Sequence, residues 1–476
     1  MIAAHFFMVS AVRHVIVLKG IIVMTVADSD LATRLDRLPL TSYHRYVITV
    51  LGVATFFDLY DLFLAGAVSL VLVRDFGAST SQLKPLLASA FVGAFIGALT
   101  IGRLGDRIGR RKALLVALGL YSVFSLVGAF STDIWMLVVC RFLGGLGIGA
   151  ELPLVDAYIA DLVPPNVRGR ATAWAFTIGF CGVPLAGFLA RALVGRTLLG
   201  LDGWRWLFLV GAIGSLVVWV LRTGLPESPR WLAEQGSRAE AERVVRRFER
   251  SAGVHAPEAD DVPEDRPPDH PERTKAAALL SRPFRTRTAM LYVFHILQSF
   301  GYYGFGSLVP IVLAAKGFDL TQSLTFTALT FLGYPVGSAL SVPVMERVQR
   351  RWLIIGSACG MAVFGLAFGL SSTDLAIVVF GFCYTAVSNF FANTFHTYQA
   401  ELFPTSLRAT AAGSAYSISR LATAAMPYVL LPVLDNHGAT AMFLVVAMAM
   451  LLLIVDIAAF GPDTTGLSLE SISPEV

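Results

Sequence analysis

An arginine-rich loop between two long apolar stretches occurs twice in this chain, at an offset of 240 residues. The first copy, GRLGDRIGRRK at 102–112, corresponds to ERVQRR at 346–351. A second loop repeats at the same offset, with DLVPPNVR at 161–168 matched by ELFPTSLR at 401–408. Two loop pairs at one offset indicate a duplicated bundle, as found in transporters whose halves rock about a central site.

The apolar stretches are long enough to cross a lipid bilayer. Hydrophobic residues make up 55% of the 476 residues and charged residues 15%, with a mean hydropathy of +0.68. Apolar runs of roughly 18 residues or more need lipid around them, and their continuity favours helices over a barrel. We therefore predict an all-α membrane protein of twelve transmembrane helices in two six-helix pseudo-repeats. The predicted spans are 46–72, 83–101, 113–130, 134–158, 171–194, 204–222, 288–314, 322–344, 352–370, 375–398, 409–433 and 439–460.

The predicted organisation follows from these spans. Residues 1–45 form an N-terminal segment, 46–222 and 288–460 the two bundles, 223–287 a linker and 461–476 a tail. Lysines and arginines gather in the short loops after spans 2, 4, 8 and 10. The positive-inside rule then places both termini, the linker and the tail in the cytoplasm. The net charge of +4 thus reports orientation in the cell membrane rather than binding to nucleic acid.

Two segments outside the spans carry predictions of their own. Residues 15–26 are apolar but too short to span, and no convincing cleavage site follows them, so we expect translation to start at Met24. In the linker, Ser237 and Glu240 predict a capping box for a helix that runs to about Arg250.

Two aspartates in the first span are candidates for proton binding. Ionisable groups inside spans cost roughly 2.5–3.5 kcal/mol each, and by default they mark a substrate or ion path. Asp58 and Asp61 are three residues apart, which puts both carboxyl groups on one helix face. Because two like charges in a poorly solvated place cannot easily both ionise, one carboxyl group should hold its proton near neutral pH. The alternative is that one of them simply anchors an arginine.

Arg141 in span 4 is predicted at the depth of Asp61. Protonation of Asp61 would release Arg141, which gives a two-state element that a substrate and a proton could both bias. A permanent structural pair is the alternative. Glu151, which follows a glycine-rich run, is either a second proton site or part of the inner gate.

Arg420 in span 11 is the best candidate for holding a substrate carboxylate, since a guanidinium matches that group with two parallel hydrogen bonds. The alternative is that Arg420 pairs with a group of span 10. Asp156 and Asp456 are expected to reach water or a loop arginine. Polar residues of spans 7 and 10 that could line the cavity are His295, Gln298, Tyr302, Tyr303, Asn389, Asn393 and His396.

The loops carry a predicted gate. Charge networks there could hold the two halves together when the cytoplasmic side is shut, and orientation signalling alone is the alternative. The predicted gating residues are Gly102, Asp106, Arg107, Gly109, Arg110, Asp161, Arg168, Glu227, Arg230, Glu346, Arg347, Arg350, Glu401 and Arg408.

Several classes of function are disfavoured. The sequence has no GxxxxGK[ST] loop, so ATP is not the expected driver. HExxH and GxSxG motifs are absent too, and the four cysteines lack metal-binding spacing, so we expect neither an enzyme nor a metal or other cofactor. The expected partners are lipid, protons and a small substrate, and the expected state is a monomer.

Several segments resemble the major facilitator superfamily. GRLGDRIGRRK resembles its loop 2–3 signature, and PESPRWL and the RGR of VPPNVRGR resemble its sugar porters. RFLGGLGIGAELP, SFGYYGFGSLVP and ELFPTSLRATAAG are more similar to the metabolite:proton symporters, the branch with nicotinate and aromatic-acid carriers. This resemblance, over about residues 30–460, implies the twelve-helix major facilitator fold and alternating access. It also implies that the helix-1 acid, here Asp61, is coupled to the helix-4 arginine, here Arg141.

Three departures from these patterns narrow the expectation. Sugar porters usually carry paired glutamines in helix 7, and Gln298 stands alone, which disfavours a sugar. Aromatic-acid symporters usually read DG[FY]D in helix 1, where Leu59 replaces the glycine, so an aromatic acid remains one option. Proton-driven drug exporters usually carry an adjacent Gly-Pro in helix 5, which Val183 interrupts here.

These observations predict a secondary active transporter that imports a small organic anion together with protons. A proton-driven exporter of a metabolite or toxic compound is the main alternative. A sugar:proton symporter and a non-transporting membrane sensor are further ones. A sensor would need a sizeable signalling domain, whereas the 65-residue central segment offers one helix and a linker.

Overall fold

The computed structural model describes residues 17–18, 21–22, 31–77, 79–254, 276–345, 347–403 and 405–464. The predicted start at Met24 and the gating residue Glu346 lie outside the described residues. Nearly all described residues are helical. Two short antiparallel hairpins pair β1 (Val17–Leu18) with β2 (Ile21–Ile22), and β3 (Thr197–Leu198) with β4 (Leu201–Asp202).

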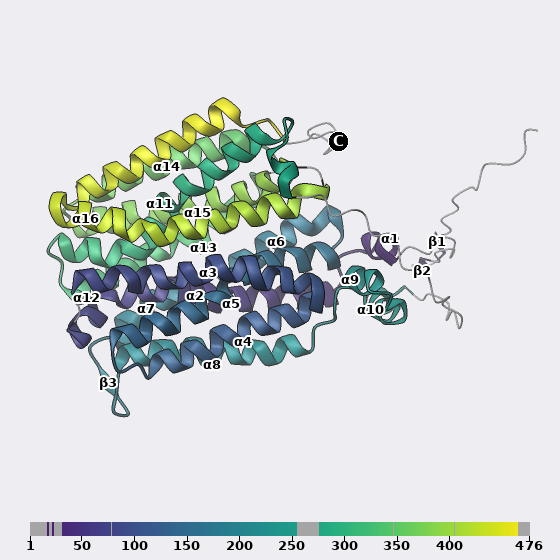
Figure 1. The fold of residues 1–476 in the computed structure, drawn as a ribbon, viewed down its shortest axis with the longest axis horizontal. Coiled ribbons are helices and arrows are strands. Elements are labelled where there is room, and N and C mark those ends of the chain that lie inside the picture. The colour runs from purple at the N-terminus through teal and green to yellow at the C-terminus, as the bar shows by residue number, and fades with distance from the viewer. Residues whose placement is uncertain are drawn as a thin grey trace, which may run out of the picture.

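The helices form two halves that lie side by side in Figure 1, the N-terminal half in purple to teal and the C-terminal half in green to yellow. The N-terminal half comprises α2 (Ser42–Phe76), α3 (Thr80–Ile108), α4 (Arg110–Ala129), α5 (Ile134–Leu162), α6 (Pro165–Phe180), α7 (Gly182–Leu193) and α8 (Gly203–Thr223). The C-terminal half comprises α11 (Arg285–Ala315), α12 (Leu320–Phe331), α13 (Gly333–Ser341), α14 (Arg350–Leu370), α15 (Asp374–Glu401) and α16 (Thr405–Phe460), preceded by the 3₁₀ turn η1 (Ala276–Leu280).

The helices account for all twelve predicted spans. Ten described helical segments are long and apolar enough to cross a membrane. One further span is the pair α12 and α13, which Leu332 interrupts. Another arises because α16 covers two spans, which turn at Gly438 in the left-handed region (φ 80°). The prediction of an all-helical, twelve-span fold is therefore confirmed.

Two interrupted helices from opposite halves face each other. Span 5 is divided at Cys181 into α6 and α7, and α6 packs on α13 while α7 packs on α12. A hydrogen bond joins each packed pair, from Thr177 to Ser338 (Oγ1 to Oγ, 2.8 Å) and from Arg191 to Thr325 (Nε to Oγ1, 2.8 Å). Each of these hydrogen bonds therefore joins the two halves on one side of the breaks at Cys181 and Leu332.

The two ends of the bundle differ. Small helices α1 (Leu31–Asp36), α9 (Pro229–Glu234) and α10 (Arg238–Ser251) cover one end, which we call the linker end, whereas the hairpin β3–β4 marks the opposite hairpin end (Figure 1). In the hairpin-end portion of α2, a Cβ on Gly66 would lie 2.5 Å from the carbonyl oxygen of Ser307 in α11. The halves therefore touch backbone to backbone there, and only glycine allows it.

The linker helices form a small cap that fastens the N-terminal segment. Arg34 pairs with Glu242 (2.7 Å) and Glu249 (2.8 Å), both from α10. The helix predicted after Ser237 is present, and Phe248 is buried beneath it. The predicted capping box is wrong, however, because Ser237 has a ψ of 52° and its side chain makes no capping hydrogen bond.

Candidate functional site

Asp61 and Arg141 meet in the interior of the N-terminal half, as the sequence predicted. Arg141 Nη1 lies 3.3 Å from Asp61 Oδ2, and Nη2 donates to the Asp61 carbonyl oxygen at 3.3 Å. Both side chains are buried. The pair connects α2 with α5, so loss of the ion pair would remove a charged contact between these two packed helices.

A second charged contact, which sequence reasoning missed in part, lies deeper toward the linker end. Glu151 of α5 pairs with Arg222 of α8, and Arg222 Nη1 also donates to the Leu114 carbonyl oxygen at 3.3 Å. Asp58 of α2 is close enough to both charges to interact with them electrostatically. Arg222 stands at the end of predicted span 6, where a cation ordinarily reaches the membrane surface.

A small cavity opens beside the Asp61–Arg141 pair. Its other lining residues come from α4, α5 and α8 alone, and several lie near the hairpin end of those helices. They are Tyr121, Phe124, Ser125, Gly128, Leu137, Cys140, Gly144 and Phe208. The cavity has room for roughly one water molecule.

A larger cavity lies between the two halves. Six predicted substrate residues line it: His295, Gln298, Tyr302, Tyr303, Asn393 and His396. The sequence did not single out its remaining lining residues, which are Leu59, Leu152, Phe176, Phe180, Ala392, Phe395, Tyr416 and Ser419. The two cavities share no lining residue, so the Asp61 carboxyl group faces a space separate from this central cavity.

Arg420 lies against the wall of the central cavity. Its guanidinium carbon is 4.2 Å from the ring centre of Tyr416 and 4.8 Å from that of Tyr303, and Nη2 donates to the Tyr416 hydroxyl group. Nε and Nη1 are buried and have no hydrogen-bond partner among the described residues. No described group of α15 bonds to Arg420, so the alternative of a span-10 partner is not observed.

The other polar side chains of the cavity bind one another. Gln298 donates to Ser419 (2.8 Å), and His295 contacts Gln399 (3.0 Å). Asn393 donates to Ser341 (2.8 Å). These contacts hold neutral hydrogen-bonding groups in fixed positions along α11, α13, α15 and α16.

Three predicted polar residues have different surroundings from those expected. Asn389 donates to the Tyr334 carbonyl oxygen at 2.6 Å and does not line the cavity, so it supports Tyr302 from behind. Asp456 is 8% exposed, and its Oδ2 has no hydrogen-bond partner among the described residues. Asp156 Oδ1 is also buried without such a partner in the described part of the chain. Neither aspartate bonds to a described loop arginine, so the expected contact with water stays a prediction.

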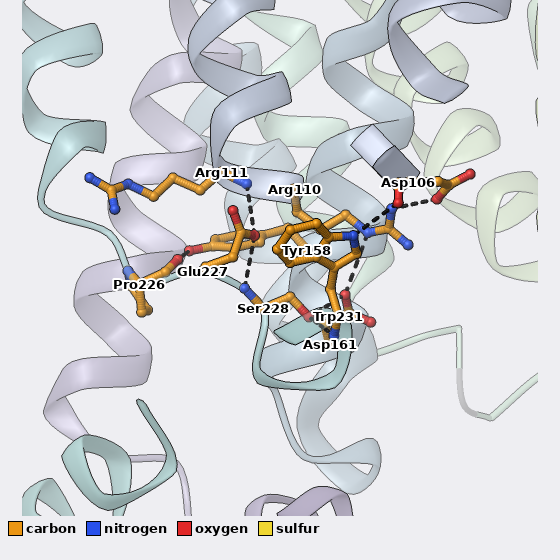
Figure 2. A network of polar contacts seen from close by, with 9 residues as sticks. All are labelled: Asp106, Arg110, Arg111, Tyr158, Asp161, Pro226, Glu227, Ser228 and Trp231. Atoms are coloured by element: carbon orange, nitrogen blue, oxygen red, sulfur yellow. Dashed lines mark hydrogen bonds and ion pairs between the residues drawn. The ribbon is translucent and has the colours of Figure 1, made fainter. Parts of the chain in front are cut away.

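The predicted gating residues of the N-terminal half join the bundle to the linker (Figure 2). Arg110 pairs with Asp106, and its Nε lies 3.7 Å from Asp161 Oδ2. Ser228 donates to Asp161 at 2.8 Å, and the Trp231 indole donates to the Asp106 carbonyl oxygen at 2.9 Å. Ser228 and Trp231 were not predicted, although both stand in the PESPRWL segment.

Glu227 completes this network beside an obligatory glycine. Its Oε1 accepts from the backbone nitrogens of Arg111 (3.1 Å) and Ser228 (2.9 Å). Gly109 has a φ of 100°, and a Cβ there would lie within 2.4 Å of the Glu227 carboxylate. The corresponding residue of the second repeat, Gln349, has a φ of −57°, so the two turns differ.

The remaining gating residues lie outside this network. Arg350 pairs with Glu401 (3.1 Å) between α14 and α15, Arg168 donates to the Val163 carbonyl oxygen, and Arg230 pairs with Asp36 of α1 (2.7 Å). Arg107 and Arg347 are exposed, and the side chains of Gly102 and Arg408 are not among those described. The contacts described here fasten each half internally or to the linker.

Twelve spans in two halves, a charged pair inside one half and a cavity between the halves define a secondary transporter of the major facilitator class. The chain belongs to the "Sugar (and other) transporter" family, whose model matches residues 46–475. Membership makes it a transporter rather than an enzyme, with no cofactor expected.

Two relatives and one solved structure illustrate the similarity. The putative metabolite transport protein YyaJ of Bacillus subtilis is 33% identical over 440 residues, covering 92% of this chain and 96% of the relative. The niacin transporter NiaP of Acinetobacter baylyi is 29% identical, covering 93% of this chain and 99% of the relative. The xylose transporter XylE of Escherichia coli, in a partially occluded inward-open conformation, matches with a TM-score of 0.72 at 21% identity, over 90% of this chain and all of that one.

Proposed function

We propose that this protein imports a small organic anion together with protons, by alternating access of the halves 46–222 and 288–460 around the central cavity. The division of charge between the halves carries the proposal. One half buries the carboxylate–guanidinium pair Asp61–Arg141, and the other buries Arg420 without a carboxylate partner among the described residues. A titratable acid suits proton binding, and a cation with unused donors suits an anion.

The lining of the central cavity supports a partly aromatic substrate. Rings of Phe176, Phe180 and Phe395 line it, next to the fixed amide of Gln298. Niacin, named for the relative NiaP, is a ring with one carboxylate and fits this combination. The substrate carboxylate would replace the Tyr416 hydroxyl group on Arg420.

Asp61 is the proposed proton carrier, with Asp58 assisting. The Coulomb attraction between charges 3.3 Å apart is on the order of 5 kcal/mol at an effective dielectric constant of about 20. Desolvation of both groups offsets part of this attraction. Protonation of Asp61 removes the attraction, which is comparable with the few kcal/mol that separate transporter conformations.

The small cavity supports a separate route for the proton. It extends from Asp61 toward the hairpin end and includes no residue of the C-terminal half. The positive-inside rule places the hairpin end outside and both termini in the cytoplasm. A proton could therefore reach Asp61 from the outer side while the substrate occupies the central cavity. The relative YdjE, an inner membrane metabolite transport protein of Escherichia coli, supports the same membrane for this chain.

The linker network has a proposed role within the N-terminal half alone. Asp106, Arg110, Asp161 and Glu227 hold the linker against the N-terminal half. Because these contacts stay within one half in this structure, we propose that they keep the N-terminal half and linker moving as one body.

Flux measurements test the proposal. Purified protein in liposomes should accumulate nicotinate, or another member of a panel of small carboxylates, when the proton gradient points inward, and a protonophore should abolish this accumulation. Xylose serves as the neutral control. Substrate expulsion under the same gradient would indicate the exporter. No flux of any tested compound, despite measurable binding, would indicate a sensor.

A further inference from the structure

Three charged side chains from three helices form a buried triad in the N-terminal half. Asp58 of α2 is 2% exposed, and Glu151 of α5 and Arg222 of α8 are each 1% exposed. Arg222 binds Glu151 directly and interacts with Asp58 electrostatically. Sequence reasoning considered the two acids separately and did not include Arg222.

The triad contains one cation for two carboxyl groups. Glu151 already occupies Nη2 of Arg222, and Leu114 occupies Nη1. Asp58 Oδ2 and Glu151 Oε2 are buried and have no hydrogen-bond partner among the described residues. A fully ionised triad would thus place a net negative charge, and two unpartnered carboxylate oxygens, in a poorly solvated interior.

Among the described residues, no second cation acts on Asp58. The other charged or titratable groups that face Asp58 are Asp61, on its own helix, and Tyr121 of α4. Asp61 is a further acid, and its partner Arg141 is engaged with it at 3.3 Å. An uncompensated buried carboxylate costs several kcal/mol, and such a group ordinarily becomes neutral by binding a proton.

We infer that Asp58, Glu151 and Arg222 form a second proton-binding site, in which one of the two carboxyl groups holds a proton. This site is distinct from the Asp61–Arg141 pair. The inference deepens the proposed function, in which Asp58 assists the proton carrier, but it depends on the charge balance of the triad and not on the identity of the transported compound.

The position of the triad connects it to the linker. Arg222 is in the last turn of α8, and the next residue, Thr223, accepts a hydrogen bond from Arg111 through its carbonyl oxygen. When the proton leaves, two carboxylates compete for Arg222, which draws α2, α5 and α8 together. We therefore expect a change of protonation to affect the position of Glu227, which follows Arg222 by five residues and holds the linker.

Infrared difference spectroscopy on the full chain in lipid at neutral pH tests the inference. The protonated site should give the C=O band of a carboxylic acid, with the small downshift in D₂O that marks an exchangeable proton. Asp58→Asn should remove this band. Glu151→Gln should remove it too, because Asp58 is then ionised and pairs with Arg222. Arg222→Gln should roughly double the band, because both acids then bind protons.

Asp456→Asn is the matched control, since Asp456 is a buried acid of the other half with an unpartnered oxygen. It should leave the triad band in place. A spectrum in which Asp58→Asn changes no carboxylic-acid band would overturn the inference, as would a band that survives Glu151→Gln at full intensity. Because the measurement involves no substrate, it gives the same answer whether or not the protein imports an organic anion.

Discussion

The two halves of this transporter bury their charges in opposite ways. The N-terminal half pairs interior arginines with carboxyl groups, as in the pair Asp61–Arg141 and the contact of Glu151 with Arg222. The C-terminal half instead holds Arg420 between the rings of Tyr303 and Tyr416, with the Tyr416 hydroxyl group as a hydrogen-bond partner.

This difference separates two kinds of chemistry. Carboxyl groups exchange protons, whereas a guanidinium stays charged at every physiological pH and can only bind or release an anion. The proposed proton sites therefore lie in one half, and the proposed anion site faces it from the other half. Each ligand then biases the same rearrangement of the halves, which is the thermodynamic requirement for coupling.

Removal of the proton carrier should give the largest effect. In Asp61→Asn the carboxyl group is permanently neutral, so uptake driven by an inward proton gradient should be lost. Exchange of labelled for unlabelled substrate should persist within about threefold, since Arg420 and the central cavity are untouched. Isotope flux in proteoliposomes measures both quantities. Concentrative uptake equal to that of the unmodified protein would show that Asp61 is not the carrier.

Removal of Arg420, the proposed anion-binding cation, should weaken substrate binding but leave transport coupled to protons. Arg420→Gln should raise the substrate Kd by roughly 10–100-fold, the effect of losing one charge-assisted contact of about 1.5–3 kcal/mol. Binding of the carboxylate selected by the flux panel can be followed by calorimetry. Tyr416→Phe is the matched control, because it removes only the hydroxyl group that competes for Arg420, and its Kd should not rise. A Kd unchanged in Arg420→Gln would place the anion elsewhere.

Blocking the small cavity should reduce proton-driven uptake without reducing substrate binding. Cys140 lines that cavity and is buried. Cys140→Phe should fill the cavity and reduce gradient-driven uptake several-fold while substrate binding stays intact. Cys140→Ser is the matched control, because it keeps the size of the side chain and should leave uptake and binding unchanged. Equal loss of binding and uptake would argue against a separate proton route.

The turn at Gly109, which differs from the corresponding turn in the C-terminal half, should be destabilised by one added methyl group. Gly109→Ala forces a left-handed backbone on alanine and drives its Cβ into Glu227, so it should cost about 1–3 kcal/mol. The melting temperature of the purified protein reports this loss. Gly169→Ala is the control, since its added Cβ meets nothing within 4 Å. Equal melting temperatures for the two variants would mean that the linker network adds no stability.

Acidic pH should have the smallest effect. It should weaken the cap of α1, α9 and α10, which has no counterpart in the C-terminal half. Burial acts to raise the pKa of Glu242, but hydrogen bonds from Arg34 and Arg246 hold that pKa below its ordinary value. A carboxylate with a lowered folded-state pKa stabilises above its unfolded pKa, and the stabilisation disappears as pH falls through the folded-state pKa. Hydrogen exchange of residues 31–38, corrected for intrinsic rates, should therefore accelerate below about pH 4.3. Arg34→Gln should show fast exchange throughout.

The sequence was sufficient to predict the spans and the Asp61–Arg141 pair. Each apolar run is long enough to need lipid, and charges inside such runs must find partners. The meeting of Asp61 with Arg141 followed from their equal depth. Arg222 escaped notice because a cation at the end of a span ordinarily reaches the membrane surface, and only the tertiary structure shows it turned inward against Glu151.

The walls of the central cavity could not be predicted in full. The sequence does not show whether a phenylalanine in a span faces lipid, a neighbouring helix or a cavity. Phe176 and Phe395 could therefore not be predicted as lining residues. The polar residues that line the cavity were found because they are rare in spans, as with Gln298. The capping box at Ser237 failed for a local reason, since backbone geometry at that residue directs its side chain away from the helix.

The paired breaks at Cys181 and Leu332 divide the contact between span 5 and the pair α12–α13 into two short packed segments. Each segment has its own hydrogen bond, Thr177 to Ser338 in one and Arg191 to Thr325 in the other. Because a break lets the two parts of a helix move independently, we expect one segment to be able to open while the other stays packed. A substrate held between the two segments would then leave on the side that opens.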